Sequence, residues 1–251
     1  MSPDVLVLCY HAVSERWPCE LAVTPGQLER QLRIVLGRGY RGASFHEAVT
    51  APAHPRTVAV TFDDAYRSVL ELAFPILSSL GLPGTVFVPT AFPDARAPMA
   101  WPGIDNWLGG PHERELAPMS WDELRRVADA GWEVGSHTRS HPRLPGLGDA
   151  ALADELRGSR SDCERRLETA CRSIAYPYSD ADPRVAEAAR AAGYEAGAAI
   201  RPRLDPLARL AWPRVAVYRG DPDWRFRLKL ARAVRGLRSS RAWPAVKRVL
   251  G

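Results

Sequence analysis

Short runs of consecutive apolar residues alternate along the chain with stretches in which apolar residues recur every three or four positions. The runs are too uniformly apolar for strands with one exposed face, so they favour strands buried on both sides, as in a parallel sheet covered by helices. Seven strands are predicted, at residues 5–10, 58–62, 84–88, 132–136, 173–176, 196–200 and 215–218.

Helices are predicted between these strands, and two of them begin with recognisable capping residues. Thr24 and Pro25 supply a cap and a first-turn proline for a helix that runs to about residue 36. Ser120 and Glu123 form a capping-box pattern that opens a helix ending near residue 131. Two more helices are predicted at residues 149–171 and 183–192.

The alternation of strands and helices favours one α/β unit rather than two domains. We expect a distorted (β/α) barrel of about seven parallel strands at residues 1–222 and a basic helical extension at residues 223–251. Residues 89–118 are rich in Pro and Gly and predict a long loop, and long loops over the mouth of a barrel often carry function.

The composition is that of an ordinary globular protein, with 46% hydrophobic and 25% charged residues. It excludes a disordered chain and a disulfide scaffold, and no apolar run is long enough to predict a transmembrane helix. The chain opens on a predicted strand rather than on a secretion signal, so a cytoplasmic location is expected. The four cysteines form no CxxC pair and are expected to be reduced thiols.

Positive charge is concentrated at the end of the chain. Residues 224–251 contain nine basic residues and no acidic one, whereas the residues before them contain 25 basic and 29 acidic residues. Aromatic and aliphatic residues within 224–250 make this pattern typical of a basic amphipathic helix that contacts an anionic membrane. The alternative is a helix that packs on the barrel and exposes its arginines to water. No nucleic-acid motif accompanies the charge, so no nucleic-acid partner is expected.

Two predicted strands are followed directly by residues that can bind metal or move protons. Asp63 and Asp64 follow the second strand, and His137 and His141 follow the fourth. Catalytic residues collect at the carboxyl ends of barrel strands, and histidines four apart fall on one side of a helical turn. The plainer alternatives are that Asp64 caps a helix beginning at Ala65 and that the histidines are structural.

Taken together, these residues predict a catalytic metal site. Two histidines and Asp64 make a typical open zinc-type site, with positions left for water and substrate. A metal lowers the pKa of water, and Asp63 beside it is then a ready proton acceptor, which is the machinery for hydrolysing an amide or an ester. A non-haem iron oxygenase uses the same ligand types, but it does not explain the second carboxylate.

Several blocks of the sequence resemble polysaccharide deacetylases with the NodB homology domain, carbohydrate esterase family 4. These blocks are TFDD at residues 61–64, SHTRSH at 136–141 and AYPY at 175–178, and the YHAV at 10–13 is similar to the start of such proteins. The resemblance spans about residues 4–218. It implies a distorted barrel that removes an N-acetyl, or occasionally an O-acetyl, group from a sugar.

The resemblance also implies roles for particular residues. Asp63 would be the catalytic base, and the divalent metal would be held by Asp64, His137 and His141. Zinc is the expected metal, and cobalt, nickel, manganese or iron are alternatives for this ligand set. The backbone N–H of Tyr178 would contribute to the oxyanion hole.

The sequence departs from the family pattern at two points. Ala175 stands where many members have an arginine that orients the base, and we hypothesise that Arg214 replaces that arginine. The late Leu-x-His block that supplies the general acid is not recognisable, and no histidine follows His141. His11 is the histidine that we nominate as the acid, with a structural hydrogen bond as its alternative role.

From the sequence we predict a metal-dependent hydrolase that removes the N-acetyl group of an amino sugar, with a nucleotide- or lipid-linked sugar as candidate substrate. A deformylase or an O-acetyl esterase would use the same site. A non-catalytic carbohydrate-binding barrel that has lost the general acid is the alternative from another class. Asp63 favours an enzyme, because a structural metal site needs no second free carboxylate.

Overall fold

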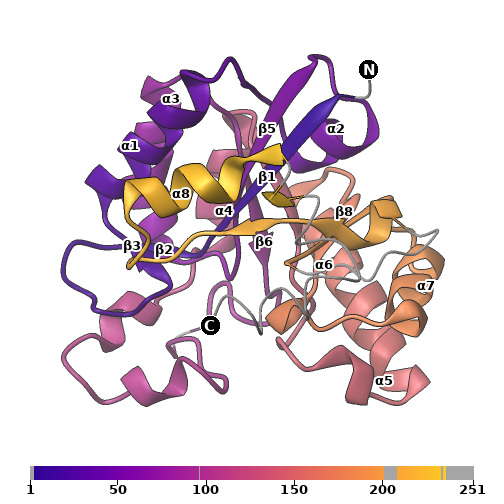
Figure 1. The fold of residues 1–251 in the computed structure, drawn as a ribbon. Coiled ribbons are helices and arrows are strands. Elements are labelled where there is room, and N and C mark those ends of the chain that lie inside the picture. Colours follow the sequence, from indigo (N-terminus) through magenta and orange to yellow (C-terminus); the bar gives the residue numbers. More distant parts are fainter. Residues whose placement is uncertain (1–2, 96, 201–207, 233, 236–251) are drawn as a thin grey trace, which may run out of the picture.

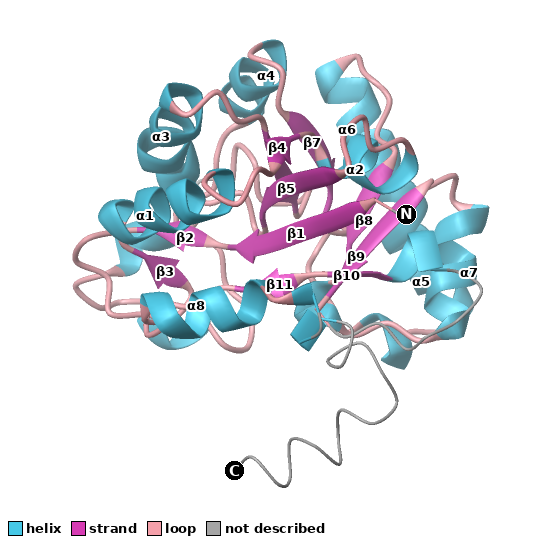
Figure 2. Cartoon of the chain, turned by 45° about the horizontal axis from the view of Figure 1, so that its top comes forward, coloured by secondary structure: helices cyan, strands magenta, loops and turns pink. Residues whose placement is uncertain are grey.

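The computed structural model describes residues 3–95, 97–200, 208–232 and 234–235. A sheet of parallel strands bends into a nearly closed barrel, and helices pack around its outside (Figure 1 and Figure 2). The strands of this sheet are β1 (Asp4–Tyr10), β4 (Arg41–Gly42), β5 (Arg56–Phe62), β6 (Gly84–Val88), β7 (Glu133–Ser136), β8 (Ser173–Ala175), β9 (Ala196–Ala199), β10 (Trp212–Pro213) and β11 (Val215–Ala216).

The two strands at the edges of the sheet, β10 and β11, are consecutive in the chain. Across the sheet the order is β10-β9-β8-β7-β6-β5-β1-β11, and β4 pairs with β5 beside this path. Strands β10 and β11 are separated in the chain by Arg214 alone, so this residue lies at the seam of the barrel. Two short strands, β2 (Ala12–Val13) and β3 (Ala22–Val23), form a separate pair.

The helices lie on the outside of the barrel. They are α1 (Pro25–Leu36), α2 (Phe45–Thr50), α3 (Phe74–Ser79), α4 (Trp121–Asp129), α5 (Asp149–Ala153), α6 (Ser159–Leu167), α7 (Pro183–Ala191) and α8 (Asp223–Leu230). The predicted caps are present: the Thr24 side chain accepts a hydrogen bond from the Gln27 N–H, and Ser120 and Glu123 form a reciprocal capping box. The parallel strand order confirms the predicted barrel, and the strands lie close to their predicted positions.

Part of the helix prediction was wrong. The helix expected at residues 149–171 consists of α5, a π-helical turn (Asp154–Gly158) and α6, and it ends at Leu167 because Glu168 adopts a left-handed backbone (φ 56°). A second π-helical turn (Val69–Ala73) precedes α3. The long loop predicted at residues 89–118 is present and contains two short 3₁₀ segments, Asp105–Trp107 and Glu113–Leu116.

The end of the described chain packs on the barrel. In α8, which lies beside α1, Phe226 and Leu230 are buried in the main hydrophobic core, whereas Trp224 and Leu228 are 68% and 53% exposed (Figure 1). Residues 236–251 lie outside the described part, so the boundary at residue 222 and the membrane contact of residues 224–250 stay predictions. Within the described residues, no helix has the length and apolar character needed to cross a membrane.

Candidate active site

The two adjacent aspartates project from the carboxyl end of β5 in different directions. The Asp63 N–H donates to the Tyr10 carbonyl at 3.0 Å and continues the strand pairing, whereas Asp64 and Ala65 adopt left-handed φ angles of 69° and 54°. This sharp turn lets both carboxylates enter the barrel mouth, where each is buried. The next helical segment has Ser68 at its start, so Asp64 does not cap a helix.

The two histidines come from the loop that follows β7. The loop is not helical: Thr138 and His141 have left-handed φ angles, and the Thr138 side chain accepts a hydrogen bond from the His141 N–H at 3.2 Å. This turn brings the two imidazole centroids to 4.9 Å from each other. The Nδ1 of His137 lies 2.7 Å from the Ala175 carbonyl and donates to it, so Nε2 is left to face Asp64.

Asp64 and the two histidines fit a divalent metal such as zinc. Oδ1 of Asp64 lies 3.3 Å from His137 Nε2 and 3.4 Å from His141 Nε2, and all three ligand atoms lie within 4.8 Å of one another. Zinc bonds of about 2.0–2.1 Å in a tetrahedron require ligand atoms about 3.3 Å apart. Among the described residues, the buried Oδ1 of Asp64 has no partner that meets normal hydrogen-bond geometry. A buried carboxylate oxygen without such a partner is expected where the oxygen binds a cation.

The protonation states of His141 and Asp64 suit metal binding. Burial lowers the pKa of His141 to about 3, so its imidazole is neutral at physiological pH, as a metal ligand must be. Burial alone would raise the pKa of Asp64, but the neighbouring imidazoles of His137 and His141 lower it. Asp64 is therefore an anion in the pocket.

Two contacts that the sequence did not reveal stabilise the loop at residues 137–141, here called the histidine loop. Glu155 accepts hydrogen bonds from the backbone N–H groups of Arg139 and Ser140, at 2.7 and 3.0 Å. The Trp101 ring stacks on the His141 imidazole with centroids 4.1 Å apart and planes at 20°. Trp101 belongs to the loop for which a function was predicted, but nothing in the sequence indicated its partner.

Asp63 is paired with Arg214 at the seam of the barrel. Nη1 and Nη2 of Arg214 donate to Oδ1 and Oδ2 of Asp63 at 2.6 and 2.7 Å, and Nη1 also donates to the Thr61 hydroxyl at 3.2 Å. Burial alone would raise the pKa of Asp63, but the guanidinium of Arg214, with help from His137, lowers it far below its usual value. The structure thus places Arg214 where the sequence hypothesis requires it.

A pocket of about 380 Å³ opens over these groups. It is lined by His11, Leu21, Asp63, Asp64, Trp101, Pro102, Gly103, Ile104, His137, His141, Arg143, Tyr178, Ser179, Ile200 and Tyr218. His11 follows β1, and its Nε2 lies 3.9 Å from Asp63 Oδ2, while its buried Nδ1 has no hydrogen-bond partner among the described residues. The alternative of a structural hydrogen bond at Nδ1 therefore finds no support.

Tyr178 also lines the pocket. Its backbone is left-handed (φ 56°, ψ 11°), within the 3₁₀ turn Pro177–Ser179 that follows β8. The Tyr178 ring packs 4.7 Å from the His141 imidazole, and the Arg143 guanidinium lies 4.2 Å from its centroid. Every residue proposed for the site from the sequence is thus found at one end of the barrel.

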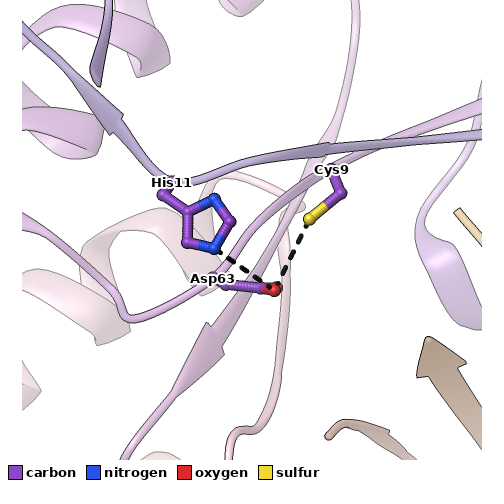
Figure 3. A group of neighbouring side chains, drawn as sticks. All are labelled: Cys9, His11 and Asp63. Atoms are coloured by element: carbon purple, nitrogen blue, oxygen red, sulfur yellow. Dashed lines mark hydrogen bonds and ion pairs between the residues drawn. The ribbon is translucent and has the colours of Figure 1, made fainter. Parts of the chain in front are cut away.

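Cys9 is a neighbour of the site that the sequence did not single out. It lies on β1 directly opposite β5 and is fully buried, as expected of a core thiol. Its Sγ donates to Asp63 Oδ2 at 3.5 Å, and Figure 3 shows Cys9, His11 and Asp63 converging on one point. The sequence shows only that Cys9 stands two positions before His11, which does not indicate a contact with Asp63.

A nearly closed parallel barrel with an Asp-His-His cluster at its carboxyl end defines an α/β barrel protein with a candidate catalytic metal centre. The sequence profile of the polysaccharide deacetylase family matches residues 50–197, and the chain belongs to this family.

Individual relatives are distant. The chain is 24% identical over 201 residues to YxkH of Bacillus subtilis, which is named for the same family, covering 78% of this chain and 64% of YxkH. It is 25% identical over 132 residues to a poly-β-1,6-N-acetyl-D-glucosamine N-deacetylase of Staphylococcus aureus, covering 49% of this chain and 40% of that protein. The chain thus matches less than two thirds of the length of either relative.

Solved structures share the fold. The Streptococcus pyogenes deacetylase PplD in complex with acetate has a TM-score of 0.76 and 20% identity, covering 92% of this chain and 100% of that chain. IcaB from Ammonifex degensii has a TM-score of 0.73 and 24% identity, covering 94% and 98% of the two chains.

Proposed function

We propose that this protein is a metal-dependent hydrolase that removes the N-acetyl group of an amino sugar. The observation that carries the proposal is the second buried carboxylate. Asp63 lies next to the Asp64–His137–His141 cluster, opens onto the same pocket and is held ionised by Arg214. A site that only held a metal would not need it.

The polar groups around the metal cluster can be assigned roles in amide hydrolysis. A divalent metal bound by the cluster would polarise the acetyl carbonyl and lower the pKa of water. Asp63 accepts the proton of the attacking water, and Arg214 fixes the orientation of both carboxylate oxygens. The Tyr178 N–H stabilises the negative charge that develops on the carbonyl oxygen. His11, whose Nε2 lies 3.9 Å from Asp63 Oδ2, donates a proton to the leaving amine.

The proposed substrate is a polymer or oligomer of N-acetylglucosamine. The S. aureus relative is named for such a polymer, and the pocket has the aromatic side chains Trp101, Tyr178 and Tyr218 in its lining. Its volume of about 380 Å³ falls in the range of roughly 300–1,000 Å³ that is typical of sites for small ligands. One acetylated sugar unit would therefore occupy the pocket while its neighbours lie outside.

Acetate release tests the proposal. Protein loaded with zinc is incubated with β-1,6-linked N-acetylglucosamine oligomers, with O-acetylated sugars, and with nucleotide- and lipid-linked N-acetyl sugars. We expect acetate from at least one N-acetyl substrate, loss of release after chelation, and recovery with added zinc. Release from O-acetyl substrates alone would replace the proposal by an esterase, and no release from any substrate by loaded protein would contradict it.

We also propose a cytoplasmic location, at the inner face of an anionic membrane. The support is the exposed pair Trp224 and Leu228 on α8, beside the exposed Arg225 and Arg227. Basic residues near anionic lipid contribute about 1 kcal/mol each to adhesion.

A further inference from the structure

Cys9, His11 and Asp63 form a second group of potential metal ligands beside the first. Cys9 Sγ, His11 Nε2 and an oxygen of Asp63 all lie within 4.8 Å of one another. The Cys9 thiol and the His11 ring both approach the Asp63 carboxylate (Figure 3). They come from two strands, because Cys9 and His11 flank Tyr10 at the end of β1 and Asp63 follows the paired strand β5.

Two distances within this group are close to those of a tetrahedral zinc site. Zinc bonds of about 2.3 Å to sulfur and 2.0–2.1 Å to nitrogen or oxygen require S···O and N···O separations of about 3.5 and 3.3 Å. The corresponding distances are 3.5 Å from Cys9 Sγ to Asp63 Oδ2 and 3.9 Å from His11 Nε2 to the same oxygen. A shift of about half an ångström by the His11 ring would complete the set.

We propose that Cys9, His11 and Asp63 form a second, inhibitory metal site that selects thiophilic divalent cations such as Zn²⁺ and Cd²⁺. The cation would take the place of the proton that Cys9 now shares with Asp63, so that an S–H···O contact becomes an S–metal–O bridge. The displaced thiol proton is released to water, and no oxidant or reductant is needed. His11 and Asp63 line the pocket, so the cation can arrive through it.

The nature of the ligands determines which metals this site accepts. A thiolate prefers soft or borderline cations, whereas Mn²⁺ and Mg²⁺ prefer oxygen ligands. The first site, with one carboxylate and two imidazoles, accepts a broader set of metals. Inhibition should therefore follow the affinity of each metal for sulfur and should be absent for Mn²⁺.

The second site should bind zinc more weakly than the first. Asp63 keeps both hydrogen bonds to Arg214, so the cation would enter beside a buried positive charge. Burial also raises the pKa of Cys9 well above its usual value, so the thiol must be deprotonated at a cost when metal binds. One zinc would fill the Asp64–His137–His141 site first, and a second would bind only in excess.

Occupation of the second site would stop catalysis, an inference that rests on the proposed function. Asp63 Oδ2 would be coordinated and unable to accept a proton, and His11 Nε2 would have no proton to donate. Zinc would thus support activity at low concentration and suppress it in excess.

Metal binding is the direct test. Metal-free wild type is titrated with Co²⁺, and the thiolate-to-cobalt charge-transfer absorption is recorded, while bound Zn²⁺ is counted by native mass spectrometry. We expect two zinc ions and a charge-transfer band for the wild type, and one zinc ion and no band for Cys9→Ser. Cys19→Ser, which alters another buried cysteine, is the matched control and should behave as the wild type.

Activity provides the second readout. Excess Zn²⁺ or Cd²⁺ should inhibit the wild type and the Cys19→Ser control, and Cys9→Ser should need at least tenfold more of either metal. A single zinc ion without a band in the wild type would overturn the second site, as would unchanged zinc inhibition in Cys9→Ser. If Cys9→Ser fails to fold, the cobalt band and zinc count of the wild type decide alone. Two zinc ions with the band, combined with no acetate release even at one equivalent of zinc, would refute the proposed function and leave the second site standing.

Discussion

Replacement of Arg214 by methionine tests how the fold keeps a buried carboxylate ionised. The Arg214 side chain has no solvent exposure, and Asp63 is 5% exposed, so solvent screens this pair very little. Removal of one partner from a buried ion pair costs about 3–5 kcal/mol, because the remaining charge is left without compensation. A domain of ordinary stability has about 5–15 kcal/mol in total, so Arg214→Met should lose a large part of it.

The loss should depend on pH in a defined direction. In the wild type the pKa of Asp63 is lower in the folded protein than in the unfolded chain, where it is about 3.9. The ion pair therefore contributes its full stability above that pH. The contribution is lost only as pH falls through the lower pKa of the folded protein. In Arg214→Met, burial without the guanidinium raises the pKa of Asp63. The variant is therefore most destabilised at neutral pH, and the deficit shrinks toward about pH 4 as Asp63 takes up a proton.

Urea unfolding of both proteins at neutral pH and near pH 4 measures this effect. The double variant Asp63→Asn/Arg214→Met should regain much of the stability, because no buried charge is left unpaired, and Arg214→Lys should show an intermediate loss. The acid limb of kcat/KM should move to higher pH in Arg214→Met. A deficit below about 1 kcal/mol at neutral pH, or one that is equal at both pH values, would refute the reasoning.

Three other predictions concern parts around the site. Glu155→Gln, which loosens the histidine loop, should weaken zinc affinity about tenfold in a competition assay with a chelator, and unchanged affinity would rule out its orienting role. His11→Ala should lower kcat about 100-fold or more and lose the decline of activity at high pH, whereas a wild-type profile would exclude it as the acid. Trp224→Ala should reduce binding to anionic vesicles about tenfold in a sedimentation assay; absence of vesicle binding by the intact protein at low salt would contradict the proposed membrane contact.

The central strands were predictable because their apolar residues indicate burial on both faces. Strands β1, β5 and β6 are mostly apolar on both faces, which is typical of a parallel sheet covered on both sides. Helix α2 was missed because it has six residues, too few to show a helical period, although Ser44 and Glu47 form a capping box that indicated its start. The two π-helical turns could not be foreseen, because no local signal distinguishes them from α-helix.

The two aspartates and two histidines of the site could be proposed from the sequence because each pair follows a predicted strand. The pairing of Asp63 with Arg214 spans 151 residues and depends on the closure of the barrel between β10 and β11, so the sequence supported only a hypothesis. The contacts of Trp101 with His141 and of Cys9 with Asp63 have no sequence signal of their own. They result from the path of a long loop and from strand register, which only the folded chain defines.

The central claim is that two adjacent carboxylates have separate duties, with Asp64 holding the metal and Asp63 moving the proton. Zinc content and acetate release, measured together on Asp63→Asn and Asp64→Asn, test it most directly. We expect Asp63→Asn to keep one zinc ion in the first site and to lose about 10²–10⁴ in kcat, and Asp64→Asn to lose both zinc and activity. Full acetate release by Asp63→Asn, or full zinc binding by Asp64→Asn, would contradict the assignment.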